Sequence, residues 1–556
     1  MWSRGHRRAL AGFAGVTVAA TILLGIGIES ASVASPFSDP VGRIRAQDES
    51  GFANSAIHLA IDGGWLTPKV LGRYYLFKPP LLVWLSGLCL KLFGVSLWAL
   101  RLPALAAAVL AIVAVWWWPL REKSALAAAS AALLLLSNPL WHIFARLCYT
   151  DMLLVASITL ALAILNWDPA LASRGGFWGF AVSTAAAVMA KNVAGLLPVA
   201  ILMLYWPIVP RKDRPGLGRV AWVIAAIAAF VAPWHLYQLA VHTNWFWTDY
   251  VEQQLLGYGL KPAGQITEEP QVWFYARRLA LTDPVLLLLT AIALPSLVIA
   301  LRSGKSHVAP LLGAWLAASL GALLIFRFRN LPYALGVLPP CALIAVLYGP
   351  FSAGRRAKLG LAILCLAFVL KTVFPAQVWG LAFGRSEPIP AAAALRSYVN
   401  LGRANELILV DGDDEFYAST LPLPSVRYYF LDPNQTILKF FPHYQYLGIV
   451  VTLDEFERLD QLRPVYAARL RAWGLDSTEP VATSIVSASP EGIRRLIRAR
   501  PQTDFYLPAR YLPAVDPFIG PDHHKVVLPG GQALLLANTP AAGIGPAAKW
   551  ALPANW

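Results

Sequence analysis

The sequence predicts a polytopic α-helical membrane protein that carries an additional α/β domain outside the membrane. Of its 556 residues, 57% are hydrophobic and 14% are charged, and the mean hydropathy is +0.55. A water-soluble globular protein does not need so much apolar sequence. The apolar residues also form about eleven runs close to the ~20 residues that cross a bilayer. The composition changes near Arg385, where an α/β pattern begins.

The basic residues predict how the spans are oriented. We expect spans near 9–29, 98–118, 124–140, 151–167, 176–191, 193–209, 219–240, 281–301, 309–326, 331–349 and 359–380. Lys and Arg cluster at 4–8, 121–123, 174, 211–219, 302–305 and 354–358, which is typical of cytoplasmic loops. The loops around 30–97, 141–150 and 241–280, and the chain after 380, then lie outside. This pattern predicts a multi-pass protein of the cell inner membrane.

Two apolar segments allow more than one interpretation. The basic start followed by a long apolar run fits an uncleaved first span better than a cleaved signal peptide, because the run is long for a signal sequence. The run at 78–94 is short, opens with Pro79-Pro80 and carries Lys91. We interpret it as an interfacial or re-entrant helix at the outer surface. The alternative is a true span in a protein with about twelve or thirteen of them.

Residues 385–556 predict an extracytoplasmic α/β domain that follows a transmembrane domain of residues 1–384. Short apolar runs at 406–412, 446–453, 480–488 and 525–537 indicate strands, and 454–459 and 491–499 indicate helices. No phosphate-cradling glycine motif occurs in this region. The four cysteines are widely spaced in apolar surroundings, so we expect small core residues and no metal site or disulfide framework.

Charged residues of both signs fall on the predicted outer face. The formal net charge of +15 does not indicate nucleic-acid binding, because the basic residues flank apolar runs. Asp151 stands at the mouth of an apolar helix, either as a proton acceptor or as a helix N-cap. Lys191 interrupts an apolar stretch and needs an anionic partner if it is buried. Lys78 precedes two prolines whose fixed φ angles aim its side chain.

Arg277 and Arg278 follow the aromatic-rich sequence VWFYA. Aromatic residues mark the membrane interface, and guanidinium groups suit a phosphate. Cations and carboxylates together at bilayer depth favour a lipid-phosphate substrate, whose phosphate the cations would bind while a carboxylate activates an acceptor hydroxyl.

Several of these stretches resemble a known family. DESGFA (48–53), the block at 63–105, RLCYTDMLLVA (146–156), MAKNVAGLLP (189–198) and QVWFYARRLALTDP (271–284) look like lipid-linked-sugar glycosyltransferases of the GT-C class. The sequence is most similar to lipid A aminoarabinose transferases and to bacterial relatives of protein O-mannosyltransferases. The resemblance covers most of residues 40–350. The C-terminal region resembles the family only in being an extracytoplasmic α/β domain that follows the last span.

The resemblance implies a polyprenyl-phosphate sugar donor and a transfer that inverts the anomeric centre on the outer face. By position in the motifs, it implies Asp48, Asp151 and the neighbouring Glu49 as catalytic residues, and Lys78, Lys191, Arg277 and Arg278 as donor phosphate-binding residues. The sequence departs from the family at Phe77, where a Glu usually precedes the lysine. Losing that carboxylate makes a divalent metal cofactor doubtful. Asn330 replaces a common basic residue, with Arg327 and Arg329 nearby.

The resulting hypothesis is a membrane glycosyltransferase surrounded by membrane lipids, whose acceptor is a lipid A-like glycolipid, another glycan or a protein. The rival hypothesis is a transporter or flippase of an anionic polyprenyl-linked lipid. A transporter should carry charged or broken helices near the bilayer midplane, often in repeated halves, and the sequence shows no internal repeat. A third hypothesis, a non-catalytic membrane anchor for the soluble domain, does not explain why charged residues such as Lys78 and Asp151 occur beside apolar segments.

Overall fold

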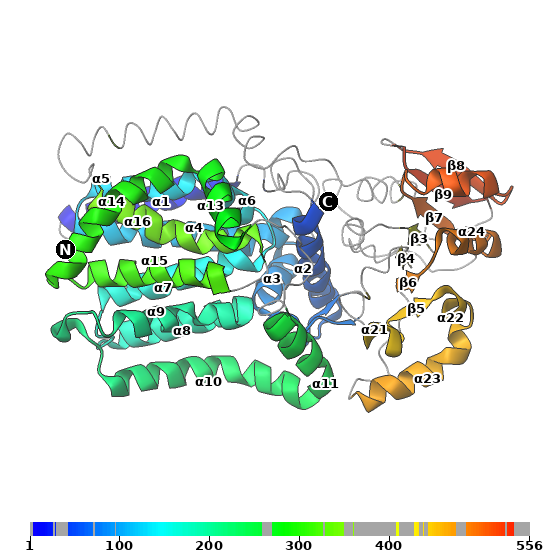
Figure 1. Ribbon diagram of the computed structural model, residues 1–556, viewed down its shortest axis with the longest axis horizontal. Coiled ribbons are helices and arrows are strands. Elements are labelled where there is room, and N and C mark those ends of the chain that lie inside the picture. Colours follow the sequence, from blue (N-terminus) through cyan, green and yellow to red (C-terminus); the bar gives the residue numbers. More distant parts are fainter. Residues whose placement is uncertain are drawn as a thin grey trace.

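The computed structural model is a helix bundle followed along the chain by a mixed sheet (Figure 1). It describes residues 4–25, 28, 43–70, 73–94, 96–257, 270–325, 329–349, 360, 398, 407–410, 428–432, 438, 443–473, 485–528 and 531–538. The bundle and the sheet lie at opposite ends of the longest axis, and α2 and α3 lie at the end of the bundle that faces the sheet (Figure 1).

The predicted spans coincide with helices, apart from 359–380, which lies outside the described residues. Seven described helical segments are long and apolar enough to cross a membrane, or eight if a bent pair counts as one span. These segments contain α4 (Leu97–Glu122), α7 (Thr150–Trp167), α8 (Arg174–Lys191), α9 (Leu197–Tyr205), α10 (Leu217–Val241), α14 (Pro284–Ser303), α15 (Val308–Ile325) and α16 (Leu338–Tyr348), and the bent pair is α5 (Ala125–Leu136) with α6 (Pro139–Ala145). The apolar part of α1 (Arg4–Gly25), Gly12–Gly25, is shorter. The prediction of a polytopic membrane protein is therefore confirmed.

The end of the bundle away from α2 and α3 collects residues from the loops predicted to be cytoplasmic. Asn166 Nδ2 donates to Glu122 Oε1 over 3.3 Å, and a ring nitrogen of His307 lies 3.1 Å from the Asn166 carbonyl oxygen. Lys123 Nζ donates to the carbonyl of Leu347 over 2.6 Å. The loop charges are thus divided between two ends of one bundle, as the sequence pattern predicted.

Helices α2 (Arg43–Asp62) and α3 (Leu81–Phe93) pack against each other at the other end. With 13 residues, α3 is about 20 Å long at 1.5 Å per residue, which is too short to cross ~30 Å of hydrocarbon. Leu82, Val83 and Leu90 are buried, whereas Leu88 and Leu92 are exposed. A short helix with one buried and one exposed apolar face supports the interfacial or re-entrant interpretation of 78–94.

The described C-terminal strands form one seven-stranded sheet in the order β5-β6-β4-β3-β7-β9-β8. Strands β3 to β7 pair in parallel, whereas β9 runs antiparallel to its neighbours β7 and β8. The bounds are β3 (Leu407–Val410), β4 (Tyr428–Asp432), β5 (Val450–Thr452), β6 (Ile485–Ser487), β7 (Asp504–Leu507), β8 (His523–Val527) and β9 (Ala533–Ala537). The α/β prediction is confirmed, and the predicted boundary between 384 and 385 falls outside the described residues.

The domain also contains helices. In chain order, α22 (Leu453–Glu457) and α23 (Leu459–Ala472) lie between β5 and β6, and α24 (Pro490–Ala499) lies between β6 and β7. Thr452 and Glu455 form a reciprocal capping box at the start of α22. The domain reaches the bundle through aromatic residues, since the rings of Trp245 in α11 (Thr243–Phe246) and Tyr444 in α21 (His443–Tyr446) lie 6.1 Å apart.

Gly448, just before β5, has the least room for a side chain among the described glycines of the domain. Its φ angle is +71°, and a Cβ atom there would lie 2.4 Å from Cγ of the buried Tyr466. We expect Gly448→Ala to destabilise the domain by ~2 kcal/mol or more, through backbone strain and the clash together. The readout is the temperature at which protease cleaves the domain in the full-length protein in detergent.

Gly520→Ala is the matched control, because a Cβ atom at Gly520 meets nothing within 4 Å. Equal cleavage temperatures for the two variants would contradict this account of the turn.

Candidate active site

The acidic and basic residues singled out in the sequence meet at the α2–α3 end of the bundle. The backbone N–H of Cys148, between α6 and α7, donates to Oε1 of Glu49 over 2.9 Å. Three residues further on, Asp151 in α7 accepts from Lys191 at the end of α8. The first contact joins the predicted outer loop, which contains α2, to the residues just before α7. The second joins the start of α7 to the end of α8.

Glu49 and Arg101 form a buried ion pair between α2 and α4. Arg101 Nε donates to Oε1 of Glu49 over 2.7 Å, and Nη2 donates to Oε2 over 3.0 Å. Both side chains are 0% exposed. Two parallel hydrogen bonds of this kind fix orientation as well as adding energy. Because this carboxylate is occupied by Arg101 and by the Cys148 N–H, the geometry favours a positioning role for Glu49 over the predicted catalytic one.

Asp48 lies in α2 immediately before Glu49 and one helical turn before Phe52. Its side chain lies outside the described part of the structure. The Phe52 ring is 1% exposed and carries Nζ of Lys78 at 5.0 Å from its centroid. Positions four apart share a helix face, so α2 places position 48 on the face that Phe52 presents to Lys78. Asp48 as the leading catalytic candidate stays a prediction.

Lys78 is held at the end of a loop that α10 anchors. Nε1 of Trp234 and Nε2 of Gln238 both donate to the carbonyl of Leu66, over 2.9 and 2.6 Å. The hydroxyl of Thr67 donates to Oε1 of Gln238 over 3.3 Å. At the other end of the loop, buried Pro79 and Pro80 lead into α3. The loop is therefore fixed on both sides of Lys78.

Asp151 and Lys191 form a second buried ion pair, at 2.5 Å between Oδ1 and Nζ. Asp151 is 2% and Lys191 is 8% exposed. Nζ of Lys191 also lies 4.4 Å from the ring centroid of Tyr333. Helix α7 has Tyr149 as N-cap and no side-chain capping bond. The alternative of Asp151 as a helix cap is thus not what the structure shows, and the anionic partner that Lys191 requires is present.

A local break in the chain positions Lys191. Helix α8 ends at Lys191, its C-cap Asn192 has a φ angle of +46°, and a 3-10 turn follows (η1, Asn192–Leu196). A Cβ atom at Gly195 would lie 2.1 Å from the backbone N of Val188, so only glycine allows this approach. The break aims Lys191 across to α7 at the point where the regular helix stops.

The two arginines of α13 (Gln271–Thr282) differ in burial. Arg278 is half-buried, donates from Nη1 to the carbonyl of Phe274 over 3.1 Å, and lies 3.6 Å from that ring centroid. Arg277 is exposed and makes no hydrogen bond or ion pair with a described residue. Arg278 is therefore the more constrained of the two side chains.

Tyr275 connects α13 to the segment that carries Tyr333. Its hydroxyl donates to the carbonyl of Asn330 over 3.3 Å. Burial raises the pKa of Tyr275 to about 12, with smaller effects from Arg329, Asp151 and Arg278. The phenol is therefore neutral near pH 7 and acts as a hydrogen-bond donor. The hydrogen bond to Asn330 joins α13 to the residues just before the segment that carries Tyr333.

Sequence reasoning did not single out Arg101, Tyr275 or Tyr333. Arg101 had a usable indication, because a charged residue inside an apolar span needs a buried partner. The two tyrosines carry no comparable pattern, since their place depends on how α13 and η4 (Leu331–Val337) pack.

No group of three or more His, Cys, Asp or Glu side chains able to hold a metal ion occurs among the described residues. Phe77, at the position of the family's glutamate, supplies no oxygen ligand, and its ring packs 5.7 Å from the ring of Tyr75. Burial raises the pKa of the Cys148 thiol to about 12, so this neighbour of the site stays protonated.

Comparison with known proteins identifies the fold class. Residues 77–237 match the family model of dolichyl-phosphate-mannose-protein mannosyltransferases. An uncharacterized protein of Aquifex aeolicus (strain VF5) is 25% identical over 212 residues, which are 37% of this chain and 42% of the relative. The match thus spans less than half of that relative's length.

Two solved structures of ArnT from Cupriavidus metallidurans extend the likeness to nearly the whole chain. The apo structure is 15% identical with a TM-score of 0.64, covering 95% of this chain and 98% of that one. The structure bound to undecaprenyl phosphate is 16% identical with a TM-score of 0.65, covering 97% and 100%. The chain has the GT-C class fold seen in ArnT, and the predicted resemblance is confirmed at the level of the fold.

The Glu49–Arg101 pair generates a stability prediction. We expect Glu49→Ala to cost ~3–5 kcal/mol, because it leaves a buried guanidinium without its counter-charge. The double change Glu49→Leu with Arg101→Leu should cost clearly less than the single changes Glu49→Leu and Arg101→Leu added together. Thermal unfolding of the purified protein in detergent measures these variants and Glu49→Ala. Additive losses would show that the two side chains do not depend on each other.

Proposed function

We propose that this protein is a membrane glycosyltransferase that moves a sugar from a polyprenyl-phosphate donor to an acceptor on the outer face of the cytoplasmic membrane. The observation that carries the proposal is the buried Asp151–Lys191 ion pair at one end of a polytopic bundle. A lysine and a carboxylate so far from water are expensive to keep, and such groups in membrane proteins mark functional sites.

The comparisons support a lipid-phosphate donor. ArnT, which shares the fold, was solved with undecaprenyl phosphate bound, and the matching family model describes enzymes that use dolichyl-phosphate mannose. The lysines at the α2–α3 end supply the complementary charge. Lys78 lies over Phe52, whose ring is 6.2 Å from that of Tyr149, two residues before Asp151. Both lysines therefore line the same small region of the bundle end.

The chemistry is a single displacement at the anomeric carbon. A carboxylate, Asp48 by position, accepts the proton of the acceptor hydroxyl as its oxygen bonds to that carbon. The bond between the carbon and the phosphate oxygen breaks, and the polyprenyl phosphate leaves with the electron pair. Lys78 and Lys191 stabilise the charge that builds on the leaving phosphate. One displacement inverts the anomeric centre.

Asp151 has two roles in this proposal. Its ion pair holds the Lys191 ammonium group at the bundle end, which keeps a phosphate-binding cation in place before the donor arrives. Its second oxygen and the nearby Tyr275 hydroxyl offer polar contacts to the sugar. The Glu49–Arg101 pair fixes α2, and with it position 48, against the start of α7.

The placement of charge argues against the rival transporter. Transporter sites lie near the bilayer midplane between broken helices. Here the buried charges Glu49, Arg101, Asp151 and Lys191 gather at one end of the bundle.

The proposal predicts that both candidate carboxylates are required. Asp48→Asn should lower the rate of sugar transfer by ~100-fold or more, the usual contribution of a general base. Asp151→Asn should lower it comparably, because Lys191 loses the carboxylate that positions it. The measurement is transfer from a panel of radiolabelled undecaprenyl-phosphate sugars to envelope glycolipids and proteins in proteoliposomes.

Asp213→Asn is the matched control, because Asp213 is half-exposed at the opposite end of the bundle, 4.0 Å from His307. Its transfer rate should equal that of the unmodified protein. Unimpaired transfer by both Asp48→Asn and Asp151→Asn would refute the proposed mechanism.

A further inference from the structure

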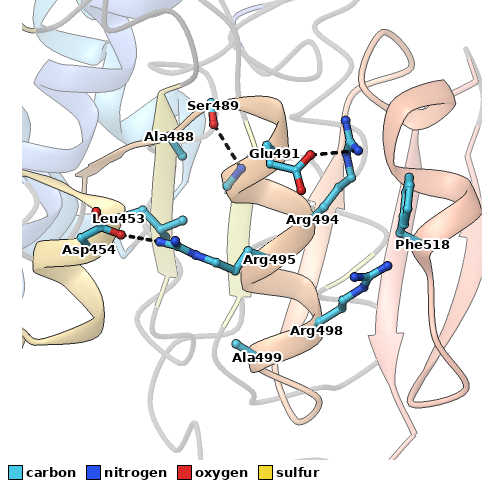
Figure 2. A pocket seen from close by; sticks show the side chains of 11 residues that line it. Leu453, Asp454, Ala488, Ser489, Glu491, Arg494, Arg495, Arg498, Ala499 and Phe518 are labelled. Atoms are coloured by element: carbon cyan, nitrogen blue, oxygen red, sulfur yellow. Dashed lines mark hydrogen bonds and ion pairs between the residues drawn. The ribbon is translucent and has the colours of Figure 1, made fainter.

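The C-terminal domain contains a polar pocket that lies apart from the charged residues of the candidate active site. It has a volume of 680 Å³ and lies between α24, α22 and the turn around Phe518. Arginine side chains of α24 project into it, as Figure 2 shows. A volume of this size accommodates one or two sugar residues, within the usual range of ligand pockets.

The sequence of α24 explains why arginines line the pocket. Ile493, Leu496 and Ile497 are 0–2% exposed and pack into the domain. The intervening Arg494 and Arg498 lie four residues apart, so they share the opposite face. Ser489 caps the helix by accepting from the Gly492 N–H over 3.1 Å. The helix thus presents two adjacent guanidinium groups on one rigid face.

The charges of the pocket are only partly neutralised. Arg495 is held by Asp454 at 2.5 Å and by Glu457 at 3.2 Å. Arg494 has one carboxylate, Glu491 at 2.9 Å, and its Nε has no hydrogen-bond partner among the described residues.

Arg498 has no ion pair in the described part of the chain and lies 5.1 Å from the centroid of the Phe518 ring. Arg494 lies 4.8 Å from the same centroid. In Figure 2 both side chains extend toward Phe518. Two guanidinium groups beside one ring, with a single carboxylate between them, leave a net positive site with unused donors.

We propose that this pocket binds a carboxylate or phosphate group of an anionic saccharide, which is part of the acceptor. Guanidinium groups bind such anions through paired hydrogen bonds, and the neighbouring Ser489 and Asp454 can bond sugar hydroxyls. The donor is not the ligand, because α24 lies at the end of the molecule far from the bundle (Figure 1). The inference rests on the proposed function and narrows its acceptor to a glycan with acidic groups away from the membrane.

The test uses the purified full-length protein in detergent and isothermal titration with three probes: tetragalacturonate, the neutral maltotetraose, and inorganic phosphate. Tetragalacturonate should bind with measurable affinity and maltotetraose should not. Arg498→Gln should weaken tetragalacturonate binding at least tenfold. Weaker but Arg498-dependent binding of phosphate alone would show that the anion, more than the sugar ring, is recognised.

Arg471→Gln is the matched control, because it removes the same charge from an exposed position on α23 of the same domain. It should bind tetragalacturonate as the unmodified protein does. Arg498 is exposed and forms no ion pair with a described residue, so its replacement should leave the unfolding temperature unchanged. Equal affinity in Arg498→Gln and Arg471→Gln, or no saturable binding of either anionic probe, overturns the proposal.

The same variants separate this inference from the proposed function. If the unmodified protein transfers sugar and Arg498→Gln raises the KM for an acidic glycan acceptor without changing that for the donor, both stand. If the unmodified protein transfers no sugar but binds tetragalacturonate through Arg498, the pocket stands and the transferase proposal fails. Transfer with an unchanged acceptor KM in Arg498→Gln overturns the acceptor role of the pocket.

Discussion

Charge buried in an apolar helix bundle must be paired, and two such pairs organise the α2–α3 end of this protein. Glu49 with Arg101 joins a juxtamembrane helix to a span, and Asp151 with Lys191 joins two spans to each other. Neither pair is needed to make a bundle, because apolar helices pack without them. Their shared location points to a site that requires both signs of charge near the membrane surface.

The remaining structure holds these pairs in position. The break after α8 lets Lys191 turn toward α7, and the contacts of Trp234 and Gln238 with Leu66 anchor the loop that leads to Lys78. The short helix α3 packs against α2 at the same end of the bundle. The catalytic groups thus depend on rigid elements, which is how sites hold a productive geometry.

The sequence predicted the helical architecture well because lipid solvation depends on composition over some twenty residues, which is a local property. It did not predict β4 and β7, since short, fully buried strands such as DFYL (504–507) lack the alternation that indicates a strand. It indicated that Lys191 needs an anion. It did not indicate which one, because Asp151 is 40 residues away and their meeting depends on how α7 packs against α8.

Arg101 shows the same limit, since its partner Glu49 is 52 residues away in sequence. The most direct test of the account is a cryo-electron microscopy structure of the full-length protein in nanodiscs with saturating undecaprenyl phosphate. The account predicts phosphate density at the α2–α3 end, within hydrogen-bonding distance of Lys78 and Lys191. Phosphate density at the opposite end of the bundle, or no bound lipid phosphate at saturation, would contradict it.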